Sequence, residues 1–190
     1  YKRIGEGDVG PNTGGMGSIS PVPFLDETLR AKVDERIVQR TLNGLKKENL
    51  PFLGFLFFGL IEVEGEPFVI EYNVRLGDPE TQSILPRTEG DVLAAMWDLA
   101  NGNAPAALGQ KEAHSASVIV ASKGYPGSYK KGKAISLSGL GPNVRVVHAG
   151  TAHDESGKLV TSGGRVLAVN ALGGRLSDCL ENVYAAIGEI

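Results

Sequence analysis

The chain has 190 residues, 42% of them hydrophobic and 22% charged, with a formal net charge of −3 and one cysteine. This apolar content excludes general disorder, and the charge gives no electrostatic reason to expect nucleic acid or an anionic membrane as a partner. One cysteine excludes an intrachain disulfide framework. The 26 glycines, roughly twice average usage, indicate tight turns and places where the backbone approaches another group closely.

The chain begins with a glycine-rich segment, residues 5–17. Six glycines and one proline exclude a helix or a central strand, so we predict a loop. A helix is then expected after an N-cap at Asp26. Its apolar side has near-helical spacing and its other face is charged, which favours a structural helix that covers a sheet. That apolar side consists of Leu29, Val33, Ile37 and Leu45.

A β-hairpin and a second helix are expected next. Residues 52–63 and 67–75 are rich in aromatic and β-branched residues and predict two strands joined by a turn at 64–66. A helix is expected over residues 90–101. Trp97 adjoins the apolar stripe of that helix, and we interpret it as core packing.

A second unit is expected after residues 102–112, where the composition changes and the charge balance becomes basic. We therefore place one domain at residues 1–105 and another at 110–190. The second holds four short strand-like runs and a final amphipathic helix after Arg175, with Cys179 on its apolar side. We predict a small sheet or a barrel closed by one helix, and of the two we favour the barrel-like β domain. The four runs are 116–121, 144–149, 158–161 and 166–171.

The second strand of the hairpin carries the clearest chemical pattern. Side chains alternate faces along a strand, so one apolar face is expected to enter the core: Phe68, Ile70, Tyr72 and Val74. The other face is expected to hold Val69, Glu71, Asn73 and Arg75. Carboxylate and amide oxygens suit Mg²⁺, and a guanidinium suits a phosphate or carboxylate. A solvated face of a half-buried sheet is the alternative.

Two loops add to this pattern. Asp78 and Glu80, braced by Pro79, follow Arg75 and form a mixed-charge loop suited to substrate contacts; a surface turn with an internal ion pair is the alternative. The backbone amides of residues 10–17 suit a concave anion site. That segment matches neither common phosphate-loop motif, so a flexible connector is equally compatible with it.

No pattern for covalent catalysis is present. The three histidines, His114, His148 and His153, are isolated in the sequence and are interpreted as structural or surface residues. The available groups instead fit phosphoryl chemistry, in which a protein mainly positions groups and neutralises charge.

Several segments together resemble a known family. They are the glycine segment at 10–17, Ile70-Glu71-Tyr72-Asn73, and Arg75-Leu76-Gly77-Asp78-Pro79-Glu80-Thr81-Gln82. The order continues through residues 124–127, 148–151 and 163–166. This combination is similar to phosphoribosylamine–glycine ligase, also called glycinamide ribonucleotide synthetase, of the ATP-grasp superfamily. The resemblance covers essentially the whole chain.

The resemblance implies a reaction and its residues. The family joins glycine to 5-phosphoribosylamine through glycyl phosphate, splitting ATP to ADP and phosphate, in cytoplasmic purine biosynthesis. It implies Mg²⁺ or Mn²⁺ ligands at Glu71 and Asn73 and catalytic roles for Arg75 and Asp78. Substrate contacts are implied at Asp8, Asn12, Thr13, Gly14, Gly15, Met16, Arg75, Gly77, Asp78, Pro79 and Glu80.

The chain matches only the C-terminal portion of that family. We therefore expect an α+β fold: the end of an ATP-grasp domain, with an antiparallel sheet and helices, followed by the barrel-like domain. Without the family's N-terminal portion, we expect the chain to be inactive alone. A third acidic metal ligand is in question, since Glu62 is the nearest acid on the preceding strand.

Two other functions are alternatives to this one. One is a non-catalytic ATP-grasp-derived module that binds a nucleotide or a partner; the intact Glu71, Asn73, Arg75 and Asp78 argue against it. The other is a biotinyl-type carrier, which would need a lysine between two methionines at a hairpin tip. The two methionines, Met16 and Met96, do not flank such a lysine.

Overall fold

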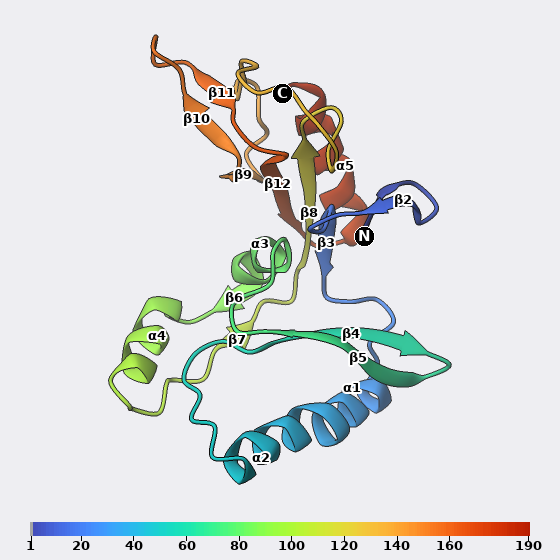
Figure 1. The fold of residues 1–190 in the computed structure, drawn as a ribbon, viewed down its shortest axis with the longest axis vertical. Helices are drawn as coiled ribbons and strands as arrows, with labels where there is room; N and C mark the ends of the chain where they lie inside the picture. Colours follow the sequence, from blue (N-terminus) through green and yellow to red (C-terminus); the bar gives the residue numbers. More distant parts are fainter. Residues whose placement is uncertain (1) are drawn as a thin grey trace. The chain divides into compact units, whose positions relative to one another are not determined.

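The computed structural model describes residues 2–190 and divides into two compact units (Figure 1). The sheet unit comprises residues up to 20, 78–88 and 110–190. The hairpin unit comprises residues 21–77 and 89–109. The chain changes unit between residues 109 and 110, within the segment 102–112, but residues up to 20 group with the C-terminal residues and not with the rest of 1–105. Residues 78–88 also group with the C-terminal residues, although they lie far upstream in the sequence.

The sheet unit is built on a four-stranded antiparallel sheet with the order β3-β8-β12-β9. Strands β3 and β9 each have one neighbour, so this is an open sheet, and the expected barrel is not found in the described residues. The three longer strands fall where the sequence predicted them, whereas β3 was not expected. The strands are β3 (Gly17–Ser20), β8 (His114–Ala121), β9 (Val144–His148) and β12 (Arg165–Gly173).

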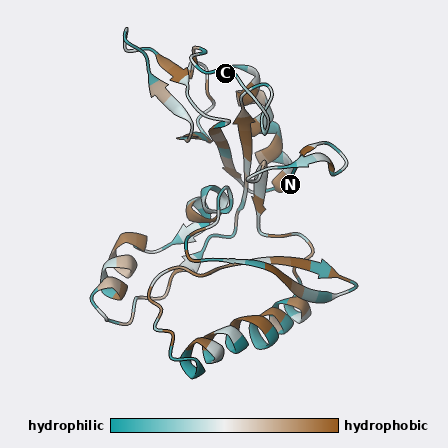
Figure 2. Ribbon diagram, viewed as in Figure 1, coloured by the Kyte–Doolittle hydropathy of each residue, from teal (hydrophilic) through white to brown (hydrophobic). Residues whose placement is uncertain are grey.

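One face of this sheet is apolar and packs against the last helix, α5 (Leu176–Gly188). Ala116 and Val169 from the sheet and Val183 from α5 are fully buried there, and Figure 2 shows the apolar colouring of β8 and α5. Cys179 lies in the same core, as predicted. Burial raises the pKa of its thiol, which donates a hydrogen bond to the His114 carbonyl. The thiol therefore stays protonated and is a packing group.

The opposite face of the sheet is polar and is also buried. The segment that covers it contains α3 (Glu80–Ile84) and the 3₁₀ turn η2 (Leu85–Arg87). The Asn170 amide donates to Ser115, Ser117 and the Ala116 carbonyl at 2.8–3.0 Å. Two serines of β3 on the same face contact the covering segment: Ser18 Oγ lies 2.7 Å from Ser83 Oγ, and Ser20 Oγ accepts from Arg87 Nη1 at 2.6 Å. Because buried polar groups need partners, these hydrogen bonds hold the covering segment on the polar face. Its buried polar members on the sheet are Ser18, Ser20, Ser115, Ser117 and Asn170.

Two small hairpins complete the sheet unit. The glycine segment, predicted to be a loop, forms one of them from β1 (Arg3–Gly5) and β2 (Val9–Asn12). Gly7 and Asp8 both have positive φ at its turn, a conformation that glycine and aspartate tolerate. The second hairpin pairs β10 (Thr151–His153), which was not expected, with β11 (Leu159–Thr161).

The hairpin unit contains a helix beside the predicted hairpin. The helix runs as α1 (Glu27–Val33), a π-helical turn η1 (Asp34–Val38) and α2 (Gln39–Lys47). The Asp26 carboxylate accepts from the Leu29 amide, which confirms the predicted N-cap. The hairpin pairs β4 (Phe57–Val63) with β5 (Glu66–Asn73). A further helix, α4 (Val92–Ala100), also belongs to this unit. The chain changes unit within the short strands β6 (Thr88–Glu89) and β7 (Gly109–Gln110).

Apolar side chains expected in a core are exposed in this unit. Relative exposure is 54% for Phe68, 65% for Ile70, 74% for Val74 and 70% for Trp97. The core prediction for these residues, and for half-exposed Tyr72, is therefore wrong in this structure. The described residues of this unit form a two-stranded hairpin and separate helices, which provide too little packed structure to bury all of these side chains.

No helix in the described part of the chain is long and apolar enough to cross a membrane.

Candidate functional site

Three candidate residues form a row along the end of β5 and the residues after it. Glu71 Oε1 lies 3.4 Å from Asn73 Nδ2, and Asn73 Oδ1 accepts from Arg75 Nη2 at 3.3 Å. Arg75 also donates to the Leu76 carbonyl at 2.8 Å. Contacts between residues two apart require a shared face. The carboxylate, the carboxamide and the guanidinium therefore lie side by side, as strand alternation predicts.

A β-bulge interrupts that alternation just before the row. Glu71 pairs with Gly59, but Val69 pairs with Leu60, so Ile70 is the extra residue. Since Gly59 and Leu60 are consecutive, Val69 and Glu71 lie on opposite faces. The prediction that Val69 belongs to the row is therefore wrong. Val69 and Tyr72 instead line a cavity beside the helix, and the Tyr72 hydroxyl lies 3.1 Å from that of Thr41.

The strand opposite Glu71 leaves room for its side chain. A Cβ added at Gly59 would lie 2.7 Å from Glu71 Cγ, closer than real Cβ contacts allow. Gly59 does not adopt a positive φ, so steric room and not backbone conformation explains the glycine here. The bare backbone of β4 thus allows the carboxylate side chain to lie across the hairpin.

The row fits a divalent cation that needs few protein ligands. Glu71 and Asn73 supply two hard oxygen donors, and Mg²⁺ usually keeps several waters and binds substrate phosphates as well. Glu62 does not join them, because its carboxylate accepts a hydrogen bond from the Gly65 amide in the hairpin turn. Among the described residues there is no group of three or more acidic, histidine or cysteine side chains that could hold a metal.

The glycine loop, residues 13–17 of the sheet unit, is closed by intramolecular hydrogen bonds. The Gly14 amide donates to the Tyr125 hydroxyl at 3.0 Å, and the Gly15 amide donates to Thr13 Oγ1 at 3.1 Å. The Thr13 amide donates to the Lys2 carbonyl. The expected concave anion site, built from free amides of this loop, is therefore not supported at these three positions.

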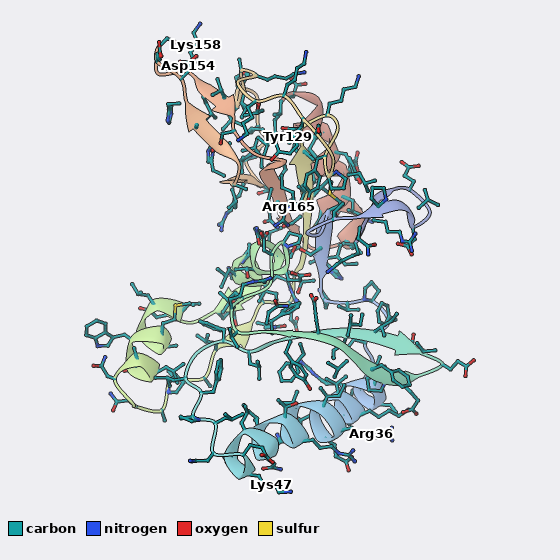
Figure 3. All side chains as sticks on the ribbon, in the orientation of Figure 1. Arg36, Lys47, Tyr129, Asp154, Lys158 and Arg165 are labelled. Carbon is teal, nitrogen blue, oxygen red and sulfur yellow. The ribbon has the colours of Figure 1, made fainter. Side chains whose placement is uncertain are left out.

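The Asp78–Pro79 segment packs against the glycine loop inside the sheet unit. Asp78 Oδ2 accepts from Arg165 Nη2 at 2.6 Å, and Asp78 Oδ1 accepts from Gln82 Nε2 at 2.9 Å. Pro79 is fully buried and its carbonyl accepts from Ser18 Oγ at 2.8 Å. The ion pair of this loop thus joins residues 87 positions apart, not neighbours within a surface turn. Arg165 is labelled on β12 in Figure 3.

The remaining predicted residues are more scattered. Asp8 lies in the β1–β2 turn, where its side chain is 80% exposed and pairs with Arg3 at 3.8 Å. Asn12 ends β2, and Glu80 begins α3. The Met16 carbonyl accepts from the Ile119 amide beside β3. Gly77 is buried in the hairpin unit.

Two residues that contact the site were not assigned from the sequence. Tyr125 and Arg165 both contact Gly14, although they lie 111 and 151 residues away. Each stands in a short motif with glycine, Gly124-Tyr125-Pro126-Gly127 and Gly163-Gly164-Arg165-Val166. Those motifs were a usable signal, but their spacing alone does not connect them to the glycine loop.

The comparisons with known proteins identify the family. Residues 1–81 match the model "Phosphoribosylglycinamide synthetase, ATP-grasp (A) domain", and residues 115–190 match "Phosphoribosylglycinamide synthetase, C domain". The chain belongs to the phosphoribosylglycinamide synthetase family. The two matches include Glu71, Asn73 and Arg75, the glycine loop and Arg165.

Curated relatives agree with this assignment. A phosphoribosylamine–glycine ligase of Xylella fastidiosa (strain Temecula1) is 44% identical over all of this chain, which covers 45% of the relative. The same name is given to a Vigna unguiculata protein that is 41% identical and 63% covered. The chain thus spans about half the length of the bacterial relative it matches.

Solved structures agree in fold. The phosphoribosylamine–glycine ligase of Thermotoga maritima superposes with a TM-score of 0.86 at 37% identity, covering 99% of this chain and 46% of that one. A biotin carboxylase of Campylobacter jejuni superposes with a TM-score of 0.61 at 18% identity, covering 92% and 38%. The second likeness concerns the fold alone.

Proposed function

We propose that the full-length enzyme containing this chain joins glycine to 5-phosphoribosylamine. ATP is split to ADP and phosphate, glycyl phosphate is the intermediate, and glycinamide ribonucleotide is the product. The observation that carries this proposal is the row of Glu71, Asn73 and Arg75 on one face of the hairpin. The row would supply cation ligands and a phosphate-binding guanidinium together, as a phosphoryl-transfer enzyme requires.

Each member of the row has a proposed role. Glu71 and Asn73 would hold Mg²⁺ or Mn²⁺ through their oxygens, and the cation would neutralise charge on the ATP phosphates. Arg75 would bind the transferring phosphoryl group and stabilise its charge. Glycine's carboxylate would attack the γ-phosphate, and the amine of phosphoribosylamine would then displace phosphate from the acyl carbon.

The sheet unit would bind the acceptor substrates. Asp78, with both carboxylate oxygens hydrogen-bonded, is held in one orientation suited to a substrate ammonium or hydroxyl group. The other proposed contacts of this unit are residues that the family resemblance named: Asp8, Asn12, Thr13, Gly14, Gly15, Met16, Pro79 and Glu80. Gly77, also named by the resemblance, is a proposed contact from the hairpin unit. Backbone carbonyls, side chains and shape would make these contacts, since three amides of the glycine loop already have acceptors.

We propose that activity also needs the residues that the relatives carry outside the matched span. The exposed apolar side chains of the hairpin unit, including Phe68, Ile70 and Val74, support this, because such surface normally contacts other protein. A cytoplasmic location is proposed as well, in keeping with a single buried, reduced cysteine. A relative from Arabidopsis thaliana is named as chloroplastic.

The test is a phosphate-release assay on the full-length enzyme and on the 190-residue chain. With Mg²⁺-ATP, glycine and freshly generated phosphoribosylamine, we expect release from the full-length enzyme only, and release that requires both acceptors. Turnover by the 190-residue chain would show that the site is complete without the remaining residues. Nucleotide binding by the full-length protein without turnover would favour the non-catalytic module.

A further inference from the structure

We propose that Arg165 is a positioning residue for the ligase site: it fixes Asp78 and the glycine loop together, and Tyr125 assists it. Nothing in the family match assigns a role to either residue. The inference rests on the proposed function, because it takes Asp78 and the glycine loop as substrate contacts. All the groups involved belong to the sheet unit.

The fold directs Arg165 to this position through a β-bulge. Arg165 pairs with Ala121, whereas Leu167 pairs with Val120, so one extra residue stands between them on β12. Because Val120 and Ala121 are consecutive, Arg165 and Leu167 lie on opposite faces of the sheet. Val120 packs with the α5 core. The bulge therefore turns Arg165 to the polar face, which the segment carrying Asp78 covers.

The guanidinium of Arg165 joins three backbone carbonyls and one carboxylate. Nη1 donates to the carbonyls of Gly14, Gly15 and Asp78 at 2.9, 3.3 and 3.3 Å. Nη2 donates to Asp78 Oδ2 at 2.6 Å. A fixed planar fork can serve several acceptors at once, which an ammonium group on a flexible stem cannot do with the same geometry. One side chain thus holds both the glycine loop and the Asp78 loop.

Tyr125 holds the other side of the same loop residue. The Tyr125 hydroxyl accepts a hydrogen bond from the Gly14 amide, and Arg165 donates one to the Gly14 carbonyl. Two glycines make this approach possible. A Cβ at Gly14 would lie 3.0 Å from Arg165 Cζ, and a Cβ at Gly164 would overlap the Tyr125 ring. The glycines at 14 and 164 are therefore explained by close contact with these two side chains.

If Arg165 fixes the site in this way, replacing it should raise the KM of some substrates and not of others. In the full-length enzyme, Arg165→Gln should raise the KM of glycine or of phosphoribosylamine about tenfold or more, the effect of losing a charge-assisted contact network. The KM of ATP should change less than about twofold, because the metal-ligand row does not use Arg165. For Arg165→Lys, the KM of the affected substrate should lie between that of the parent enzyme and that of Arg165→Gln. Tyr125→Phe should raise the same KM by a smaller factor.

A double variant tests whether Arg165 acts through Asp78. If it does, Arg165→Gln combined with Asp78→Asn should be little worse than Asp78→Asn alone. The matched control is Arg175→Gln, which removes another Arg–Asp pair of the same unit, Arg175–Asp178 at 2.8 Å, and should leave every KM unchanged. Equal increases in all three KM values would mean a general structural role and overturn the proposal.

Amide hydrogen exchange gives a measurement that does not depend on activity. Amide exchange of the glycine loop, residues 13–17, should accelerate in Arg165→Gln and Tyr125→Phe and stay unchanged in Arg175→Gln. Unchanged exchange, or acceptor KM values within about twofold of the parent enzyme in a folded Arg165 variant, would overturn the inference. If Arg165→Gln does not fold, Arg165→Lys and Tyr125→Phe are judged by the same criteria.

Absence of ligation by the parent enzyme would refute the proposed function and not this inference. The exchange result would still decide whether Arg165 and Tyr125 hold the glycine loop.

Discussion

The two sets of candidate residues, one in each unit, are held in place in different ways. In the sheet unit, Asp78 and Pro79 are fixed by a buried serine, by Gln82 and by Arg165. In the hairpin unit, Glu71 and Arg75 are exposed, and the row is joined by contacts within one strand end. Tertiary hydrogen bonds therefore place the first set, and local strand geometry places the second.

This difference separates two kinds of mutational effect. Hydrogen bonds to buried groups contribute to stability as well as to position, because an unpaired buried group is costly. An exposed ligand side chain contributes little to stability, so its loss should be seen mainly in the chemistry. Changes in the polar face of the sheet should thus alter folding, whereas changes in the row should alter catalysis.

The largest expected effect is that of Glu71→Ala on the chemistry. In the full-length enzyme, kcat should fall about 100-fold or more and its Mg²⁺ dependence should change, since a cation ligand is lost. The free energy of unfolding should stay within about 0.5 kcal/mol, as for other surface changes. Urea unfolding and a Mg²⁺ titration of kcat measure both, with Glu35→Ala, an exposed helix position, as control. An unchanged Mg²⁺ dependence would refute the metal role.

The next largest effect is expected for Asn170→Ala, and it concerns the free energy of unfolding and not catalysis. The change leaves Ser115, Ser117 and a backbone carbonyl without their donor in a buried place, which should cost about 2–3 kcal/mol. Urea unfolding measures this cost. The control is Asn43→Ala on an exposed face of α2. A cost equal to that of the control would show that the buried hydrogen bonds of Asn170 do not stabilise the protein.

A smaller effect is expected for Gly59→Ala. The new methyl group would displace the Glu71 side chain, an overpacking cost of about 1 kcal/mol or more, so the Mg²⁺ concentration for half-maximal activity should rise about threefold or more. Gly44→Ala is the matched control, because a Cβ at Gly44 meets nothing within 4 Å. If both variants keep the parental Mg²⁺ requirement, Gly59 does not position Glu71.

The smallest effect is expected for Glu66→Gln: it should lower the melting temperature slightly, by an amount that depends on pH. Hydrogen bonding from Lys32 lowers the pKa of Glu66 from its ordinary value of 4.5, with help from Arg36. The stabilisation is therefore present above that ordinary value and is lost as pH falls through the lowered pKa of the folded state. Melting temperatures of the variant and the parent should differ slightly at pH 7 and converge in acid. Glu64→Gln in the adjacent turn is the control; a difference that persists in acid would exclude the ion pair as its cause.

Local signals in the sequence predicted much of the fold. The N-cap at Asp26, the hairpin, the final helix and three strands of the sheet depend on caps, turns and hydrophobic periodicity, and all were found. Strand β3 was missed because Gly17–Ser20 contains glycine and serines and has no apolar alternation. Its pairing with β8 is a long-range contact that no local signal encodes.

The sequence predicted which residue types the candidate site contains, but only partly predicted which face of a strand each of them occupies. Alternation placed Glu71, Asn73 and Arg75 in one row, but two β-bulges changed the faces of other residues. One separated Val69 from Glu71, and the other turned Arg165 away from Leu167. A bulge shifts every later side chain by one position in the alternation, and a single sequence read with period two does not reveal it.

The sequence by itself determined which groups are available: a carboxylate, an amide and a guanidinium on one strand, and a glycine loop with small residues. Only the tertiary structure decided which of them meet. Arg165 reaches Gly14 and Asp78 across 151 and 87 positions, and Trp97 is exposed although its helix is amphipathic. The physical reason is that periodicity is a local property, whereas burial and hydrogen-bond partners depend on which distant segments the fold brings together.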